Sequence, residues 1–184
     1  MERVPRHRKV RHILAPAPLA IAFATVLALA LVAAAAMAAT NGTRGAAAPG
    51  PNGCPTNKSL KTAPIADLAP PARTQIAAFD VLSGPINKQT QTFTLKVRVG
   101  STCSVNIKGA SVYVTAVPYN QFSIPAEELT GDDGTATLVF RRDANFPASS
   151  KQQQLTLFIR ATKPGEDPLA GVSTRRLVAV NFSG

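Results

Sequence analysis

The residue types that most often perform catalysis are sparse in this chain of 184 residues. Its two histidines, His7 and His12, both lie in a basic N-terminal segment, so the rest of the chain has none. A Ser-His-Asp or Cys-His nucleophile system therefore cannot form there, and neither can a histidine-ligated zinc or copper site. We expect a protein that is not an enzyme and that uses no cofactor and no metal.

Two pairs of adjacent carboxylates, Glu127-Glu128 and Asp132-Asp133, could contribute to a glycosidase site or to a calcium site. The second pair lies in the sequence Gly-Asp-Asp-Gly, between two strand-like segments. Aspartate tolerates the left-handed conformation that tight turns need, and glycine adopts it without steric cost. We therefore favour a hairpin turn at Asp132 and Asp133, with calcium binding as the alternative.

The two cysteines, Cys54 and Cys103, both follow a long apolar segment. They lie too far apart in the sequence to form a Cys-x-x-Cys motif. An isolated pair of cysteines in an exported protein favours a disulfide bond, because the compartment is oxidising. Two reduced, buried cysteines are the alternative.

Four residues are candidates for an interaction surface. Tyr119 and Phe122 lie in VPYNQFSIP, a segment stiffened by prolines. Aromatic side chains on such a loop are common binding anchors, although they can also fold back and cap the end of a domain. Arg175 and Arg176 lie near the C-terminus, where they either form a solvated strand edge or contact an anionic cell-wall polymer.

The N-terminal region predicts a membrane-directed protein. Residues 1–12 carry five Lys or Arg against one Glu, and residues 13–39 form an apolar run without charge. Such a run is long enough to span a bilayer, and its basic flank stays in the cytoplasm. We expect a single-pass plasma-membrane protein with an extracellular C-terminal domain. The alternative is secretion after cleavage of a signal peptide near Ala36-Met37-Ala38.

The formal net charge of +10 does not indicate a nucleic-acid-binding protein. Such proteins concentrate their basic residues on one element, whereas here they are scattered among strand-like segments. The densest basic cluster is the one that flanks the apolar run. We expect no nucleic-acid partner.

The remaining chain divides into a linker and one folded domain. Residues 40–74 are rich in Gly, Pro, Asn and Thr, a composition that predicts a flexible linker. Residues 75–184 alternate apolar and polar residues, as in TFTLKVRV, SVYVTAV, TATLVFRR, LTLFIRA and RLVAVNF. A period of two indicates half-buried strands. The pattern predicts an all-β fold, an antiparallel β-sandwich of about seven strands, with a small closed barrel as the alternative.

Two of these segments point to a family. The sequence KGASVYVTAVPYN, followed by TGDDGTATLVFRR, resembles bacterial immunoglobulin-like domains of the invasin and intimin kind. The closing segment, LFIRATKPGEDPLAGVSTRRLVAV, looks like the end of single-domain, membrane-tethered or secreted actinobacterial relatives. The resemblance covers roughly residues 75–184. It implies an immunoglobulin-like β-sandwich that serves as an exported structural or adhesive module and has no catalytic residues.

Together these features predict a non-enzymatic, membrane-tethered extracellular module for adhesion, assembly or protein interaction. Its expected partner outside the membrane is an extracellular protein or an anionic cell-wall polymer. The alternative is a secreted accessory domain that binds carbohydrate or the cell wall.

Overall fold

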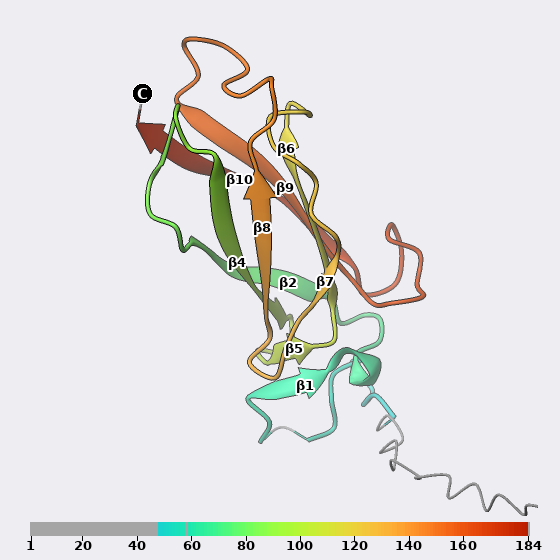
Figure 1. Ribbon diagram of the computed structural model, residues 1–184. Coiled ribbons are helices and arrows are strands. Elements are labelled where there is room, and N and C mark those ends of the chain that lie inside the picture. Colours follow the sequence, from blue (N-terminus) through green and yellow to red (C-terminus); the bar gives the residue numbers. More distant parts are fainter. Residues whose placement is uncertain (1–47, 58, 184) are drawn as a thin grey trace, which may run out of the picture. The chain divides into compact units, whose positions relative to one another are not determined.

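The computed structural model describes residues 48–57 and 59–183, and within them the fold is all-β (Figure 1). The expected basic tail, 1–12, and the expected membrane segment, 13–39, lie outside these residues. No helix in the described part of the chain is both long and apolar enough to cross a membrane. One short 3-10 helix, η1 (Ile65–Asp67), accompanies the strands. The strands are β1 (Thr62–Pro64), β2 (Thr74–Val81), β3 (Ile86–Asn87), β4 (Thr92–Ser101), β5 (Asn106–Lys108), β6 (Ser111–Val117), β7 (Glu128–Leu129), β8 (Thr135–Arg141), β9 (Gln154–Thr162) and β10 (Thr174–Ser183).

The first sheet is built around β4. Strand β2 pairs antiparallel along one edge of β4. The other edge is shared, because β8 pairs with residues 92–98 of β4 and β5 pairs at Gly100. Strand β1 extends this sheet by pairing parallel with β5.

The second sheet has the order β3-β10-β9-β6-β7. Strands β10, β9, β6 and β7 are successively antiparallel, while the two-residue β3 pairs parallel with the end of β10. Inward-facing side chains from both sheets belong to one buried hydrophobic cluster. The two sheets therefore form a sandwich-like arrangement, as the alternation of the sequence predicts.

The alternation also predicts the core correctly. In β4, the four apolar side chains of TFTLKVRV are buried, and the polar residues between them are exposed or half-buried. The inward positions of β6, β8 and β9 are buried in the same way: Val112, Val114, Ala116, Ala136, Leu138, Phe140, Leu155, Leu157, Ile159 and Ala161. Burial of these side chains supplies most of the free energy that favours this fold.

The segment before β2 is folded onto the domain. The composition of residues 40–74 predicts a flexible linker, but the part from residue 48 contains β1, η1 and two fully buried side chains, Ala63 and Leu68. The backbone N–H of Ala69 donates to the carbonyl of Gly53, with 2.9 Å between nitrogen and oxygen. A few apolar residues and local hydrogen bonds are thus enough to dock this segment, although it could not fold alone.

Candidate interaction surfaces

The disulfide bond expected from the sequence is present. Cys54 is bonded to Cys103, with 5.8 Å between their Cα atoms. Cys103 follows directly after β4, so the bond joins the N-terminal segment to the end of the central strand of the first sheet. The alternative of two reduced cysteines does not hold for this structure.

The two aromatic candidates occupy different environments. Phe122 is only 2% exposed and packs among the rings of Phe93 and Phe146, whereas Tyr119 is 65% exposed. The residue after Phe122, Ser123, donates its backbone N–H to the carbonyl of Arg141 at the end of β8. The segment is therefore held against the core. Phe122 caps the end of the hydrophobic core and is not available to an external partner.

The basic candidates lie at the other end of the second sheet. Arg175 pairs with Arg160 near the start of β10, whereas Tyr119 follows the end of β6, where Val117 pairs with Thr156 of β9. The guanidinium of Arg176 donates to the carbonyl of Ile76 in β2 at 3.3 Å. The four residues proposed from the sequence consequently do not form one interaction loop.

The Asp-Asp-Gly segment is a tight turn before β8. Gly134 has a φ of +75°, and its backbone N–H donates to the carbonyl of Gly131. The Asp133 carboxylate accepts hydrogen bonds from the hydroxyl and the backbone N–H of Thr135, at 2.7 Å and 3.0 Å. These bonds, together with Lys96, lower the pKa of Asp133. The tight turn expected from the sequence is therefore present, but it is not a hairpin, because β7 and β8 lie in different sheets and pair with β6 and β4 respectively.

Members of both carboxylate pairs form ion pairs with Lys or Arg side chains. Asp132 forms an ion pair with Lys108 of β5. Glu127 pairs with Arg160 at 2.9 Å and accepts a hydrogen bond from Ser111. In the described residues, no group of three or more His, Cys, Asp or Glu side chains could hold a metal ion. These carboxylates connect strands and turns to one another.

The outward face of the second sheet combines one of the candidates from the sequence, Arg175, with four residues that the sequence analysis did not single out. Cross-strand neighbours place Phe158 of β9 beside Leu177 of β10, and Arg160 beside both Tyr113 of β6 and Arg175 of β10. Leu177 is 62% exposed. The Arg160 guanidinium lies over the Tyr113 ring, 4.7 Å from its centroid. We call these five residues the β6–β9–β10 face. Alternation in the sequence indicates that they point outward, but only the strand pairing brings them together.

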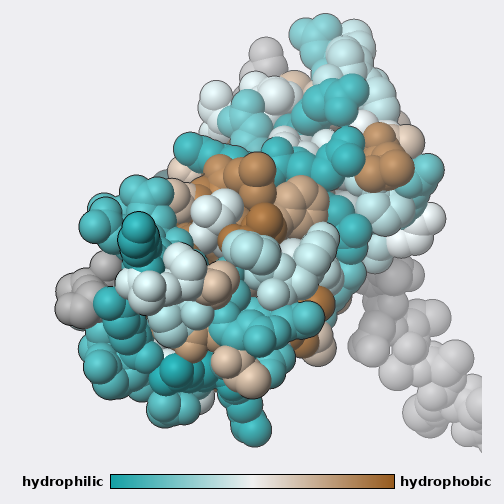
Figure 2. All heavy atoms as spheres, turned by 90° about the horizontal axis from the view of Figure 1, so that it is seen from above, coloured by the Kyte–Doolittle hydropathy of each residue, from teal (hydrophilic) through white to brown (hydrophobic). Residues whose placement is uncertain are grey.

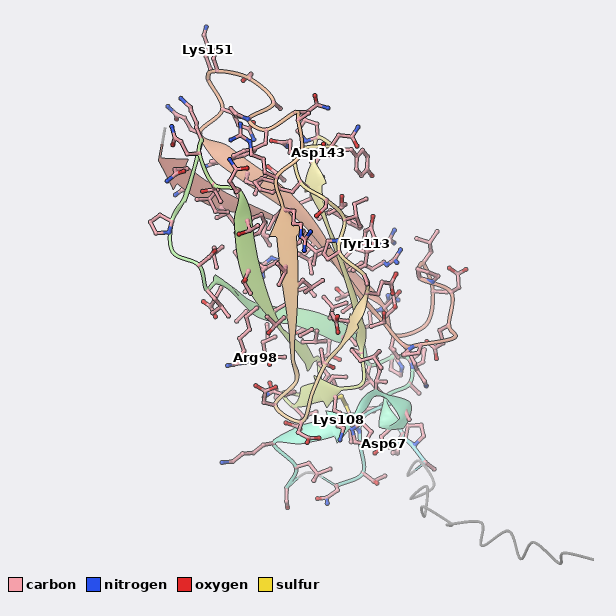
Figure 3. All side chains as sticks on the ribbon, in the orientation of Figure 1. Asp67, Arg98, Lys108, Tyr113, Asp143 and Lys151 are labelled. Carbon is pink, nitrogen blue, oxygen red and sulfur yellow. A yellow bond between two sulfur atoms is a disulfide. The ribbon has the colours of Figure 1, made fainter. Side chains whose placement is uncertain are left out.

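A polar hollow of about 480 Å³ lies at the end of the domain opposite β1, where Figure 3 labels Lys151. It is formed by the turn after β3, the loop before β9 and the end of β10. Its lining contains two lysines, four amide side chains and one hydroxyl: Lys88, Lys151, Gln152, Gln153, Gln154, Asn181 and Ser150. Figure 2 looks onto this end and shows a largely hydrophilic surface around a hydrophobic group.

Comparisons with protein families, with curated proteins and with solved structures found no match.

Proposed function

We propose that this chain is a non-enzymatic extracellular module with an immunoglobulin-like fold, tethered to the plasma membrane through residues 13–39. In this proposal the module binds an extracellular protein through the β6–β9–β10 face. The support comes from the order of the strands, from the disulfide bond and from the composition of that face.

The order of the strands supports an immunoglobulin-like topology. In immunoglobulin sandwiches the first, second and fifth strands share one sheet, and the third, sixth and seventh share the other. Here β2, β4, β6, β7, β8, β9 and β10 are counted as the first to the seventh strand. The first, second and fifth (β2, β4 and β8) then share one sheet, and the third, sixth and seventh (β6, β9 and β10) share the other. The fourth strand, β7, pairs with β6 in the second sheet, whereas the fourth strand of constant-type domains belongs to the first.

The disulfide bond supports export. Disulfides persist in extracellular and periplasmic compartments and are rare in the reducing cytosol. The bond between Cys54 and Cys103 joins residues that both follow the apolar run, as expected for a domain carried across the membrane.

The observation that carries the binding proposal is the pairing of the half-buried Phe158 with the exposed Leu177 on the outward face of the second sheet. Protein interfaces combine an apolar centre with Tyr, Phe and Arg side chains. Here Tyr113 and Arg160 border the apolar pair, and Arg175 makes no ion pair within the described residues. The matching partner is a folded protein whose apolar patch is bordered by carboxylates.

Site-specific photo-crosslinking in intact cells tests this proposal. A photoreactive residue is placed at Leu177 and, as the matched control, at Val139, which is exposed on β8 of the other sheet. We expect one discrete crosslinked protein from position 177 and none from position 139. When Arg175→Glu is added to the chain with the photoreactive residue at position 177, the crosslinked product should disappear. No crosslink from position 177, or the same products from both positions, would contradict the proposal.

Protease treatment of whole cells tests the tether. An N-in, single-pass chain loses residues 48–184 to external protease while its N-terminus stays protected. Soluble protein in the medium that begins near Ala39 would instead support the secreted alternative.

A further inference from the structure

We propose that the polar hollow is a second binding site, which takes a polyanionic glycan: a polymer with hydroxyl groups and regularly spaced carboxylate, phosphate or sulfate groups. The site adjoins the β6–β9–β10 face, because Gln154 and Asn181 continue the outward rows of β9 and β10. It has a different chemistry from that face, and it extends the proposed function from protein binding to glycan binding.

The charge of the hollow favours an anion. Among the described residues, its lining includes the ammonium groups of Lys88 and Lys151 and no Asp or Glu. The adjoining end of β8 is also basic, because it has two arginines, Arg141 and Arg142, and one acidic residue, Asp143. Ammonium groups form charge-assisted hydrogen bonds with carboxylate, phosphate and sulfate oxygens, which are stronger than bonds between neutral groups.

The amide side chains of the lining suit a hydroxylated ligand. Gln154 donates from Nε2 to the Oδ1 atom of Asn181 at 3.1 Å. This bond occupies the oxygen of Asn181 and leaves its Nδ2 group as a donor. The side chain of Gln153 is exposed beside it. Amides both donate to and accept from hydroxyl groups, so they can contact the neutral parts of a sugar repeat.

The loop that forms one wall is fixed by Gln152. Its Nε2 donates to Oε1 of Gln121 at 2.7 Å and to the carbonyl of Gln154 at 2.9 Å. Its Oε1 accepts the backbone N–H of Ala148 at 2.6 Å. Gln152 is thus a positioning residue that holds the loop before β9.

Arg142 fixes the two walls relative to each other. Its guanidinium donates to the carbonyl of Lys88 at 2.9 Å and to the carbonyl of Phe146 at 2.8 Å. These carbonyls belong to the turn after β3 and to the loop before β9. A site whose walls are held in place loses less entropy when a ligand binds.

The size and polarity of the hollow favour a polymer over a membrane lipid. The hollow lies at the end of the domain opposite β1 (Figures 1 and 3). Its volume of about 480 Å³ lies in the usual range for small-ligand sites, about 300–1,000 Å³, and so accommodates a short stretch of polymer. Its lining is mostly polar, which suits charged and hydroxyl groups better than an acyl chain.

The test measures binding of the full chain, held in uncharged detergent, to polygalacturonate, dextran sulfate and neutral dextran at physiological salt. We expect binding to at least one of the two polyanions and none to dextran. Lys88→Gln/Lys151→Gln should weaken it about tenfold or more, which corresponds to about 1.4 kcal/mol. Asn181→Asp keeps an oxygen for Gln154 but adds a negative charge, and it should weaken binding similarly.

The matched control is Lys61→Gln/Arg98→Gln, which removes two exposed charges elsewhere on the domain. Its affinity should stay within about twofold of the original chain. The proposal is overturned if both double variants weaken binding equally, if the original chain binds neither polyanion, or if it binds only phosphatidylglycerol vesicles. Thermal melts of each variant confirm that it is folded. Crosslinking from position 177 tests protein binding by the β6–β9–β10 face, and polyanion binding tests the hollow. Failure of one proposal can therefore be told from failure of the other.

Discussion

The ring of Phe122 meets the ring of Phe93 edge to face, with 4.9 Å between the ring centroids. Phe93 in turn stacks on Phe140 at 4.5 Å, and Phe122 contacts Phe146 at the same distance. Such aromatic pairs stabilise a core beyond the burial of their area, by about 0.5–1.5 kcal/mol each. The irregular segment after β6 is thereby attached to the core, although it has little regular pairing of its own.

Substitution of Phe122 and of Tyr119 should show that the first lies in the core and the second on the surface. Phe122→Ala removes a fully buried ring, so we expect a loss of about 3–5 kcal/mol in the free energy of unfolding. Tyr119→Ala removes an exposed ring and should change that free energy by less than about 0.5 kcal/mol. Urea denaturation of both variants measures the difference. Similar losses for the two would contradict the placement of Phe122 in the core.

Gly134 should tolerate a side chain less well than Gly84, although both have a positive φ. A Cβ atom at Gly134 would lie 2.7 Å from Cβ of Asn106 and 3.1 Å from the carbonyl oxygen of Val99, whereas nothing lies within 4 Å at Gly84. Gly84→Ala therefore bears only the conformational cost, about 1 kcal/mol. Gly134→Ala should lose at least about 1 kcal/mol more, as measured by urea denaturation. Equal losses would mean that β5 does not pack against this turn.

Removal of the disulfide bond should weaken the whole domain. The bond closes a loop across a separation of 49 residues, which corresponds to about 4 kcal/mol in the chain-entropy description. We expect the free energy of unfolding of Cys54→Ser/Cys103→Ser to fall by most of this amount. The original chain melted with a reductant should match the double variant. A double variant as stable as the oxidised chain would show that the bond does not constrain the unfolded state.

Lowering the pH should remove the contribution that Asp133 makes to the stability of the fold. The pKa of this exposed carboxyl is lowered from its ordinary value of 3.8 in the folded chain by the hydrogen bonds from Thr135 and by Lys96. A lowered pKa stabilises the fold above about pH 3.8, and this stabilisation is lost as the pH falls through the folded pKa. The original chain should melt slightly above Asp133→Asn at pH 6, and the gap should close as the pH falls below 3.8 and through the lowered pKa of the folded chain. A gap that does not change with pH would contradict this role.

The strands were predictable because their signal is local. Each inward position of β4, such as Leu95 or Val97, is apolar and each neighbour is polar, so a period of two identifies the strand without knowledge of its partners. The turn at Gly134 was predictable for the same reason, since its residue types report backbone conformation directly.

The candidate surfaces were less predictable because they depend on pairing. Phe158 and Leu177 become neighbours only when β9 and β10 pair, and Lys88 meets Asn181 only because β3 lies against the end of β10. The sequence leaves open whether Phe122 is a surface anchor or a cap of the domain, because nothing local reveals that it packs against the rings of Phe93 and Phe146. The regular structure of residues 48–74 was less predictable, because composition reports only the average hydrophobicity of a segment. The pairing of β1 with β5 and the buried Leu68 depend on the rest of the fold.

The bond between Cys54 and Cys103 also determines where a mechanical load would enter the domain. A pull along the chain from residue 48 crosses the two sulfur atoms and arrives just after β4, whose edges are hydrogen-bonded to β2, β8 and β5. The intervening residues, 55–102, form a covalently closed loop that such a pull cannot extend. An oxidised domain that holds a polymer at its far end would therefore behave as a stiff link. Reduction would let a pull enter at β1 instead, and residues 55–102 could then extend as their strands unpair, so the redox state of one bond affects how far the domain yields under load.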